Sequence, residues 1–159
     1  MSRSEAQGHV VCRLTPADVP RLRDLNRLFG HAFRDSETYC SQSPGDDYVR
    51  GLLSDPHIIV LVALLGAEVA GGLVAYELRK FERERSEIYL YDLAVAEPFW
   101  RRGIASALLE RLCALAAQRG ASSVFVQADY VDAPAIALYE KFGLREEVLH
   151  FDIKPSSGS

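Results

Sequence analysis

The amino-acid sequence predicts an α/β fold in which helices flank a mixed β-sheet, and three observations support this prediction. The chain has 159 residues, 48% of them hydrophobic, which is enough for one ordinary globular core. A β-branched apolar run near the middle is joined by a tight turn to a returning strand, which is typical of an antiparallel hairpin. Strand-like and helix-like segments then alternate in the second half, which indicates an α/β arrangement.

The sequence also predicts the limits of the folded part. A flexible lead of residues 1–9 precedes a single domain of residues 10–154, and a flexible polar tail of residues 155–159 follows. The first ten residues lack the apolar core of a signal peptide, and no apolar run is long enough to span a membrane. These features predict a cytoplasmic protein that does not enter a membrane.

The first third of the domain predicts a strand followed by two helices. The strand is expected over residues 10–14, and the segment 15–18 begins a helix because a threonine cap is followed by proline. Gly30 is expected near the end of this helix. Residues 31–45 are rich in turn formers and predict a loop, after which a short helix ends at Asp55. One side of that short helix is expected to carry Tyr48, Leu52 and Leu53.

The remaining elements follow from apolar runs and the turn residues between them. Strands over residues 57–65 and 69–78 form the hairpin, and a third strand over residues 87–95 follows a charged connection. Residues 104–119 form the clearest helix, because apolar residues recur along one side of it. The last elements are expected to be a strand over residues 123–128, a helix over residues 134–142 that ends at Gly143, and a strand over residues 144–153.

Charge and cysteine content argue against several classes of function. The formal net charge is −4, and no block of Lys and Arg is large enough to bind nucleic acid. The three cysteines form no CxxC pair and no Cys/His cluster, so no metal site is predicted. Cys12 and Cys113 are expected in the core, and Cys40 in a loop. The acidic excess suits a cationic small molecule as the partner, although it is also common on solvated surfaces.

An anion-binding site is predicted where the strand over residues 87–95 leads into the helix that begins at Ile104. The first amide groups of a helix have no partner within it, and the helix dipole favours negative charge there. Arg101 and Arg102 add positive charge, and Gly103 lets the backbone approach a ligand closely. The pattern suits a pyrophosphate, but a solvated loop before a helix would have the same sequence features.

Residues 92–105 resemble motif A of the GNAT acetyltransferases, and residues 135–144 resemble their motif B. The two motifs occur in the family's order and at a similar separation. The resemblance implies the GNAT acyltransferase fold and acetyl-CoA as cosubstrate, with no metal. The chain departs from the family at Trp100, where Gln or Arg is common, and at Asp132, where many members carry a CoA-contacting Asn. The residues that the resemblance assigns to acetyl-CoA are Leu93, Ala94, Val95, Arg101, Arg102, Gly103, Ile104 and Ala105.

A narrower resemblance links three segments to the aminoglycoside 3-N-acetyltransferases of the GNAT type. The segments are residues 86–95, 126–130 and 145–153. They imply acetylation of the 3-amino group of a 2-deoxystreptamine antibiotic such as gentamicin. Two alternatives remain open: acetylation of another amine, such as a polyamine or a peptide N-terminus, and a CoA-binding module without catalysis.

Asp92 and Tyr139 are the predicted catalytic residues. A carboxylate in an otherwise apolar strand is costly without a purpose, so Asp92 is predicted to be the base that deprotonates the amine. Tyr139 occupies a motif B position at which GNAT enzymes commonly place a tyrosine near the CoA sulfur. This position implies that Tyr139 protonates the leaving thiolate. The alternative for each residue is a structural role, as a strand-end contact or a core aromatic.

A polycationic acceptor is expected to bind among carboxylates. Asp129 follows a strand that comes next after the motif A helix, which places it near the predicted cleft. Asp35 and Glu37 are more readily explained as surface charges. The predicted acceptor-binding residues are Asp129, Glu87, Asp152 and Tyr130.

The last predicted strand leads us to expect a homodimer. GNAT sheets commonly end in a two-strand hairpin after motif B, whereas residues 144–153 supply only one strand here. Because unpaired edge strands seek partners, a second copy of the chain is expected to complete this edge.

Overall fold

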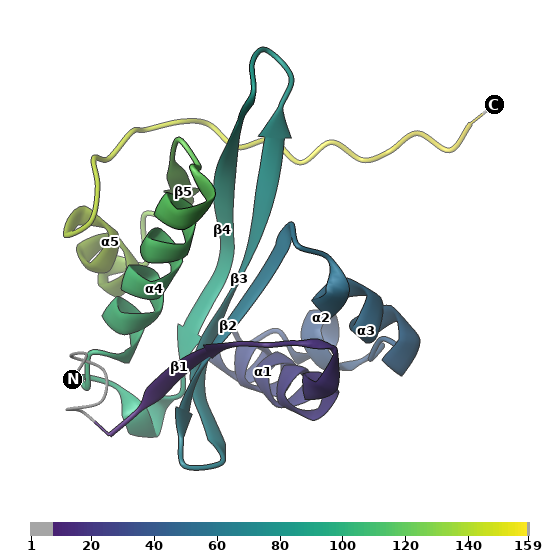
Figure 1. Ribbon diagram of the computed structural model, residues 1–159, viewed down its shortest axis with the longest axis vertical. Helices are drawn as coiled ribbons and strands as arrows, with labels where there is room; N and C mark the ends of the chain where they lie inside the picture. The colour runs from purple at the N-terminus through teal and green to yellow at the C-terminus, as the bar shows by residue number, and fades with distance from the viewer. Residues whose placement is uncertain (1–7, 159) are drawn as a thin grey trace. The chain divides into compact units, whose positions relative to one another are not determined.

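A computed structural model describes residues 8–158 of the chain; residues 1–7 of the expected lead and the last residue of the tail lie outside them. The strands are β1 (Val10–Arg13), β2 (Ile58–Leu65), β3 (Glu68–Lys80), β4 (Arg85–Val95) and β5 (Val124–Val126). They form a five-stranded sheet in the order β1-β2-β3-β4-β5 (Figure 1). Neighbouring strands are antiparallel except β4 and β5, which are parallel. The predicted mixed sheet with helices beside it is confirmed.

The chain divides into two compact units, and the boundary in the sequence lies between Gln127 and Ala128. The first unit contains the whole sheet and most of the helices, and the second unit contains one helix. The helical elements are η2 (Pro16–Asp18), α1 (Val19–Ala32), α2 (Ser36–Cys40), α3 (Asp46–Ser54), η3 (Glu97–Phe99), α4 (Ile104–Arg119) and α5 (Ala133–Glu140).

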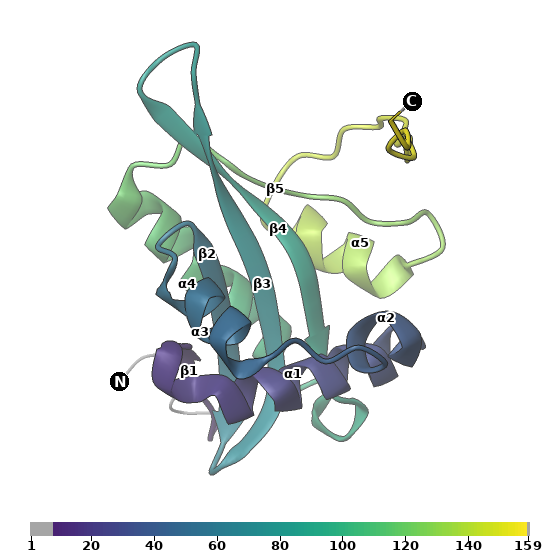
Figure 2. The same cartoon turned by 90° about the vertical axis from the view of Figure 1, so that its right-hand side faces the viewer.

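In the first unit, α1 and α4 lie on opposite faces of the sheet (Figures 1 and 2). The face toward α1 carries one hydrophobic cluster, in which Leu25 and Phe29 are almost fully buried with Val60 and Val62 of β2. Side chains alternate between the two faces of a strand, so the intervening residues of the sheet face α4. The buried residues on that second face and on α4 include Leu61, Leu73, Ile88, Leu90, Leu108 and Leu112.

The N-terminal helices start as predicted but differ in detail. The Thr15 hydroxyl accepts a hydrogen bond from Ala17, and the Thr15 amide donates to the Asp18 carboxylate at 2.8 Å, which caps the first turn. The helix is a short 3₁₀ turn, η2, which continues directly as α1 and ends two residues after Gly30. The prediction that residues 31–45 form only a loop is wrong, because Asp35 caps the short helix α2 within them.

The buried side of α3 is shifted from the one that the sequence predicted. Val49 and Leu53 are buried, whereas Tyr48 is 64% exposed. The aromatic ring misled the prediction, because size and hydrophobicity alone do not distinguish a core position from an exposed neighbour.

Helix α4 has the predicted limits and is fastened to the sheet at its C-terminal end. Gly120 adopts a left-handed conformation that ends the helix, as expected. The guanidinium of Arg119 donates to Glu77 of β3 at 2.7 Å, and the Ser86 hydroxyl of β4 donates to the same carboxylate at 2.6 Å. These partners hold the pKa of Glu77 below its usual value although burial opposes them.

The second unit contains α5 and an extended segment. The Asp132 carboxylate accepts a hydrogen bond from the Ala135 amide at 3.2 Å and thereby caps α5. The helix ends earlier than predicted, with Lys141 rather than Gly143 as its C-cap. The predicted strand over residues 144–153 is wrong for the described chain, since these residues pair with no strand. A period-two apolar pattern favours an extended backbone, but a strand also requires a partner edge.

Two smaller expectations also need correction. Cys12 and Cys113 are only partly buried, and Cys40 lies in α2 instead of a loop. Among residues 8–158, no helix is both long enough and apolar enough to cross a membrane.

Candidate active site

Asp92 lies just after an irregularity in β4 that turns its side chain toward the α1 face of the sheet. Leu90 pairs with Ala75, and Asp92 pairs with the adjacent residue Val74, so Tyr91 is an extra residue in β4, a β-bulge. Val74 packs against the cluster on the α1 face, and cross-strand partners share a face. Asp92 therefore points away from α4.

A tyrosine that the sequence did not indicate holds Asp92. The hydroxyl of Tyr39, on α2, donates a hydrogen bond to Asp92 Oδ1 at 2.7 Å. Burial raises the pKa of Asp92, and the bond from Tyr39 opposes that rise by stabilising the charged form. A carboxylate whose pKa is raised is a better proton acceptor near neutral pH, so the setting suits a general base.

Four aromatic rings form a row across three neighbouring strands beside Asp92. We refer to Tyr76 of β3, Tyr89 and Tyr91 of β4, and Phe125 of β5 as the aromatic row. Tyr89 stacks on Phe125 with ring centroids 4.7 Å apart. Tyr91 contacts Tyr89 and Tyr76 edge-on, at 5.4 and 5.9 Å, and is 61% exposed. The row therefore offers accessible ring surface to a ligand.

The aromatic row lies in the negative field of Asp92. The pKa values of Tyr76 and Tyr89 are both raised, mainly by burial and further by the charge of Asp92. Sequence reasoning missed these residues, although the alternating Tyr89 and Tyr91 were a visible signal. Their neighbours on β3 and β5 depend on strand register, which one sequence segment does not reveal.

The far end of β4 has an open backbone edge on one side. Strand β5 pairs with β4 only from Ile88 to Leu90, whereas β4 continues to Val95. In the first unit, residues Tyr91 to Val95 thus have a strand neighbour on the β3 side alone. This edge contains Leu93, Ala94 and Val95, which the family resemblance assigns to acetyl-CoA and whose backbone it implies holds the pantetheine arm. An extended ligand with amide groups can bind such an edge as an added strand does.

The loop after this edge has a geometry suited to an anion. Gly103 adopts a left-handed conformation with φ 74°, and Arg101 does so with φ 64°. No described side chain caps the N-terminus of α4, so the amide groups of its first turn, which begins with Ile104 and Ala105, are left for a ligand. Arg101 and Arg102 are both exposed beside this helix end. All of the residues predicted to bind the pyrophosphate are thus brought together.

Trp100, the departure from the family pattern, has a structural function. Its indole N–H donates to the carbonyl oxygen of Val95 at 2.7 Å, which ties the loop back to the end of β4. The guanidinium of Arg102 lies 5.5 Å from the centre of the Phe99 ring, a cation–π contact within the same loop. These contacts fix the path of the loop with no side chain covering the helix end.

The four predicted acceptor-binding residues are divided between the two units of the chain. Glu87 is on β4, and its carboxylate already accepts a hydrogen bond from Arg85 at 2.9 Å. Glu87 is five residues before Asp92, which corresponds to about 16 Å along the strand. Asp129, Tyr130 and Asp152 belong to the second unit. Tyr130 is exposed beneath the Arg145 guanidinium, and Asp152 contacts His150 at 3.0 Å.

Asp35 and Glu37, which the sequence placed on the surface, both lie at α2. Asp35 caps the helix by accepting from the Thr38 amide. Hydrogen bonding to the Thr38 side chain first, and then to its backbone, holds the pKa of this carboxyl below its usual value. Glu37 is exposed and lies in the first turn of the same helix. Asp35 therefore shapes the element that carries Tyr39 and does not act as a free charge.

Tyr139 lies on α5 in the second unit and is partly buried. Burial, with the nearby charge of Asp132, raises the pKa of Tyr139 to about 12. The phenol therefore keeps its proton at neutral pH, which a general acid requires.

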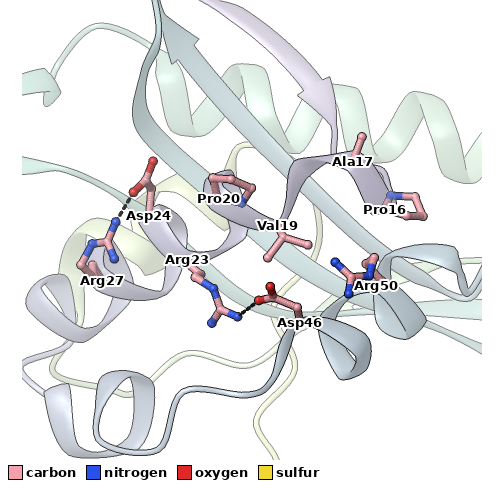
Figure 3. Close-up of a pocket in the computed structure, with 9 residues that line it drawn as sticks. All are labelled: Pro16, Ala17, Val19, Pro20, Arg23, Asp24, Arg27, Asp46 and Arg50. Carbon is pink, nitrogen blue, oxygen red and sulfur yellow. Dashed lines mark hydrogen bonds and ion pairs between the residues drawn. The ribbon is translucent and has the colours of Figure 1, made fainter.

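A separate hollow on the first unit does not have the features of a reaction site. It has a volume of about 550 Å³ and lies between η2, α1 and α3 (Figure 3). Its three arginines are neutralised, since Arg23 pairs with Asp46, Arg27 with Asp24 and Arg50 with Asp47. Over residues 8–158, no group of three or more His, Cys, Asp or Glu side chains could hold a metal ion.

Comparison with protein-family models and solved structures gives consistent matches. The model of the acetyltransferase (GNAT) family matches residues 22–144. An aminoglycoside acetyltransferase from an uncultured soil metagenomic sample is 55% identical, with a TM-score of 0.90 over 93% of this chain and 99% of that one. Another from a soil metagenomic sample, solved in complex with sisomicin, is 31% identical, with a TM-score of 0.86 over 95% and 99% of the two chains.

Two curated proteins are more distant. The ribosomal protein bS18-alanine N-acetyltransferase of Escherichia coli is 24% identical over 94% of this chain and 89% of its own length. The probable N-acetyltransferase family 8 member 5 of Mus musculus is 29% identical over 76% of this chain. The match spans 53%, about half, of that mouse protein.

Proposed function

This chain belongs to the acetyltransferase (GNAT) family, and we propose that it transfers an acetyl group from acetyl-CoA to the 3-amino group of a 2-deoxystreptamine aminoglycoside such as gentamicin. The single observation that carries the proposal is the position of Asp92. It lies on the open edge of β4, and the loop that follows this strand leads to the uncapped N-terminus of α4. In this proposal the reaction takes place in the cytoplasm, where acetyl-CoA is supplied, and inactivates the antibiotic.

In the proposed reaction, each part of the site has one task. The first-turn amides of α4, with Arg101 and Arg102, hold the pyrophosphate, and the backbone of residues 93–95 holds the pantetheine arm. Asp92 accepts a proton from the acceptor amine, which then attacks the thioester carbonyl. A backbone N–H of residues 93–95 stabilises the oxyanion. The proposal requires that residues 10–154 act as one domain, since Tyr139 must reach the leaving thiolate.

The acceptor is proposed to bind over the aromatic row. Ammonium groups are attracted to the faces of aromatic rings, and the charge of Asp92 adds to that attraction. The likeness to two aminoglycoside acetyltransferases supports a polycationic antibiotic as this acceptor. Further contacts are proposed from Asp129, Asp152 and Tyr130. Glu87 remains a weaker candidate, because Arg85 already engages its carboxylate.

The proposal is tested by incubating the protein with acetyl-CoA and gentamicin and measuring thiol release. We expect turnover with one added acetyl group by mass spectrometry, and an NMR spectrum of the product that places the group on the 3-amino nitrogen. Acetylation elsewhere on the antibiotic would overturn the regiochemistry alone. Turnover only with polyamines or peptide N-termini would replace the acceptor class, and tight CoA binding without any turnover would favour a binding module.

Replacing Tyr139 by phenylalanine is expected to lower kcat about 10²-fold, because the leaving thiolate loses its proton donor. The pKa of about 12 predicts that ionisation of Tyr139 contributes no loss of activity up to about pH 10. Steady-state kinetics from pH 6 to 10 check both statements, with calorimetric CoA binding as the control. An unchanged kcat with intact CoA binding would remove Tyr139 from the mechanism.

A homodimer remains part of the proposal. In the first unit the outer edge of β5 pairs with no strand, and the side chains of Leu149, Phe151 and Ile153 are 74–86% exposed. A second copy can cover both, by adding its extended segment to a free edge. Light scattering at micromolar concentration should give twice the chain mass of 17.6 kDa. The double variant Leu149→Asp, Phe151→Asp should be monomeric, and the control variant Glu146→Gln should remain dimeric. A wild-type chain that is monomeric at this concentration would contradict the proposed dimer.

A further inference from the structure

We propose that Tyr39 is a positioning residue for Asp92, a role that rests on the proposed function of Asp92 as the base. The two residues are 53 positions apart, yet the Tyr39 hydroxyl donates to Asp92 Oδ1 at 2.7 Å. This bond occupies one carboxylate oxygen and leaves Oδ2 for the acceptor amine. Tyr39 thus fixes the direction in which Asp92 presents its free oxygen.

The position of Tyr39 is built into the packing of α2 against α1. The Tyr39 ring lies 5.8 Å from that of Phe29, which is almost fully buried, and 5.6 Å from that of Phe33. Gly30 allows the two helices to touch, since a Cβ there would lie 3.3 Å from Ser36 Cα and 3.4 Å from Tyr39 Cβ. Tyr39 therefore reaches Asp92 from a helix that packs closely against α1.

The phenol acts as a donor to Asp92 over the whole working pH range. Burial first, and then the bond to Asp92, raises the pKa of Tyr39 well above its usual value. The other titratable groups around the pair are Tyr76 from β3, Tyr89 and Tyr91 from β4, and Asp35 at α2. Among these groups, Tyr39 is the one that donates a hydrogen bond to Asp92.

Replacing Tyr39 by phenylalanine tests the inference, because the ring and its packing remain while the donor is lost. Loss of a donor that favours the carboxylate raises the pKa of Asp92, and the base works only when deprotonated. The acidic limb of kcat/KM for the amine should therefore move up by about one pH unit, with about a tenfold loss at low pH. KM for acetyl-CoA should not change. Tyr48→Phe, which removes an exposed hydroxyl on α3, is the matched control.

A direct readout separates this inference from the proposed function. The ¹³C resonance of the Asp92 carboxyl, followed against pH, gives its pKa whether or not the protein acetylates anything. A higher pKa in Tyr39→Phe than in wild type and Tyr48→Phe supports the role of Tyr39 even if gentamicin is not a substrate. An unchanged Asp92 titration, or an equal loss of activity at every pH, would overturn it.

Discussion

Replacing Asp92 by asparagine is expected to lower kcat/KM for the amine by about 10²- to 10⁴-fold. The amide is nearly the same size and still accepts the hydrogen bond from Tyr39, but it cannot take a proton from the acceptor. CoA binding should persist, because in the proposed site the β4 edge and the start of α4 hold the cosubstrate through backbone groups. Thiol-release kinetics and calorimetry on the same preparation check the two statements.

The stability of the Asp92 variant distinguishes lost chemistry from a lost fold. Burial raises the pKa of Asp92 in the folded chain, so the folded state binds this proton more tightly than the unfolded state does. The contribution of this group to stability therefore falls as pH rises through the unfolded and then the folded pKa. Asparagine does not titrate, so the variant does not lose this stability as the pH rises. At pH 8 its melting temperature should therefore be no lower than that of wild type.

A matched control for this variant is Asp47→Asn on α3, which removes a carboxylate whose partner is Arg50. Its kinetics should equal those of wild type. Full activity of Asp92→Asn would show that another group deprotonates the amine. A melting temperature well below that of wild type would instead mean that Asp92 is needed for folding.

Replacing Gly72 by alanine should destabilise the first unit by about 1–3 kcal/mol. A Cβ at this position would lie 2.5 Å from Leu25 Cδ1 and 2.8 Å from the Leu61 carbonyl oxygen. The Leu25 side chain is almost fully buried, and the carbonyl belongs to the neighbouring strand, so neither has room to move. Leu25 of α1 thus packs closely against the sheet at Gly72, which pairs with Ala94 on the proposed pantetheine edge.

Gly51→Ala in α3 is the same chemical change, but we expect it to increase the stability of the protein. Nothing lies within 4 Å of its Cβ position, and alanine favours a helix over glycine by about 0.5–1 kcal/mol. Urea denaturation should therefore move the midpoint down for Gly72→Ala and up for Gly51→Ala. Equal midpoints for the two variants would contradict the close approach of Leu25.

Local signals made much of the fold predictable. Residues 104–119 form the predicted helix because an apolar stripe and a terminal glycine are both local features. The β2–β3 hairpin follows from a tight turn between two apolar runs in the same way. The loop that we propose as the pyrophosphate site could be located for a related reason, since a strand, a glycine and the helix start follow one another in sequence.

The parts of the fold and of the candidate site that the sequence did not predict depend on contacts between residues far apart in the chain. The bond from Tyr39 to Asp92 spans 53 positions and comes from a helix hidden in a segment that resembles a loop. The aromatic row depends on the register of three strands. The failed strand over residues 144–153 shows the converse, since its apolar alternation was real but alternation cannot supply a partner edge.

The extra residue in β4 divides that strand into two functionally independent halves. Before Tyr91, even-numbered residues such as Ile88 and Leu90 are buried on the α4 side, and after it Asp92 and Ala94 face the α1 side. Substitutions at Ile88 and Leu90 therefore alter core packing, whereas a substitution at Asp92 is expected to alter the proposed chemistry. A regular strand that kept all of these residues would place Asp92 on the same face as Leu90, so that its carboxylate would be turned into the hydrophobic core. One inserted residue thus lets a single strand serve both the folding of the protein and its reaction.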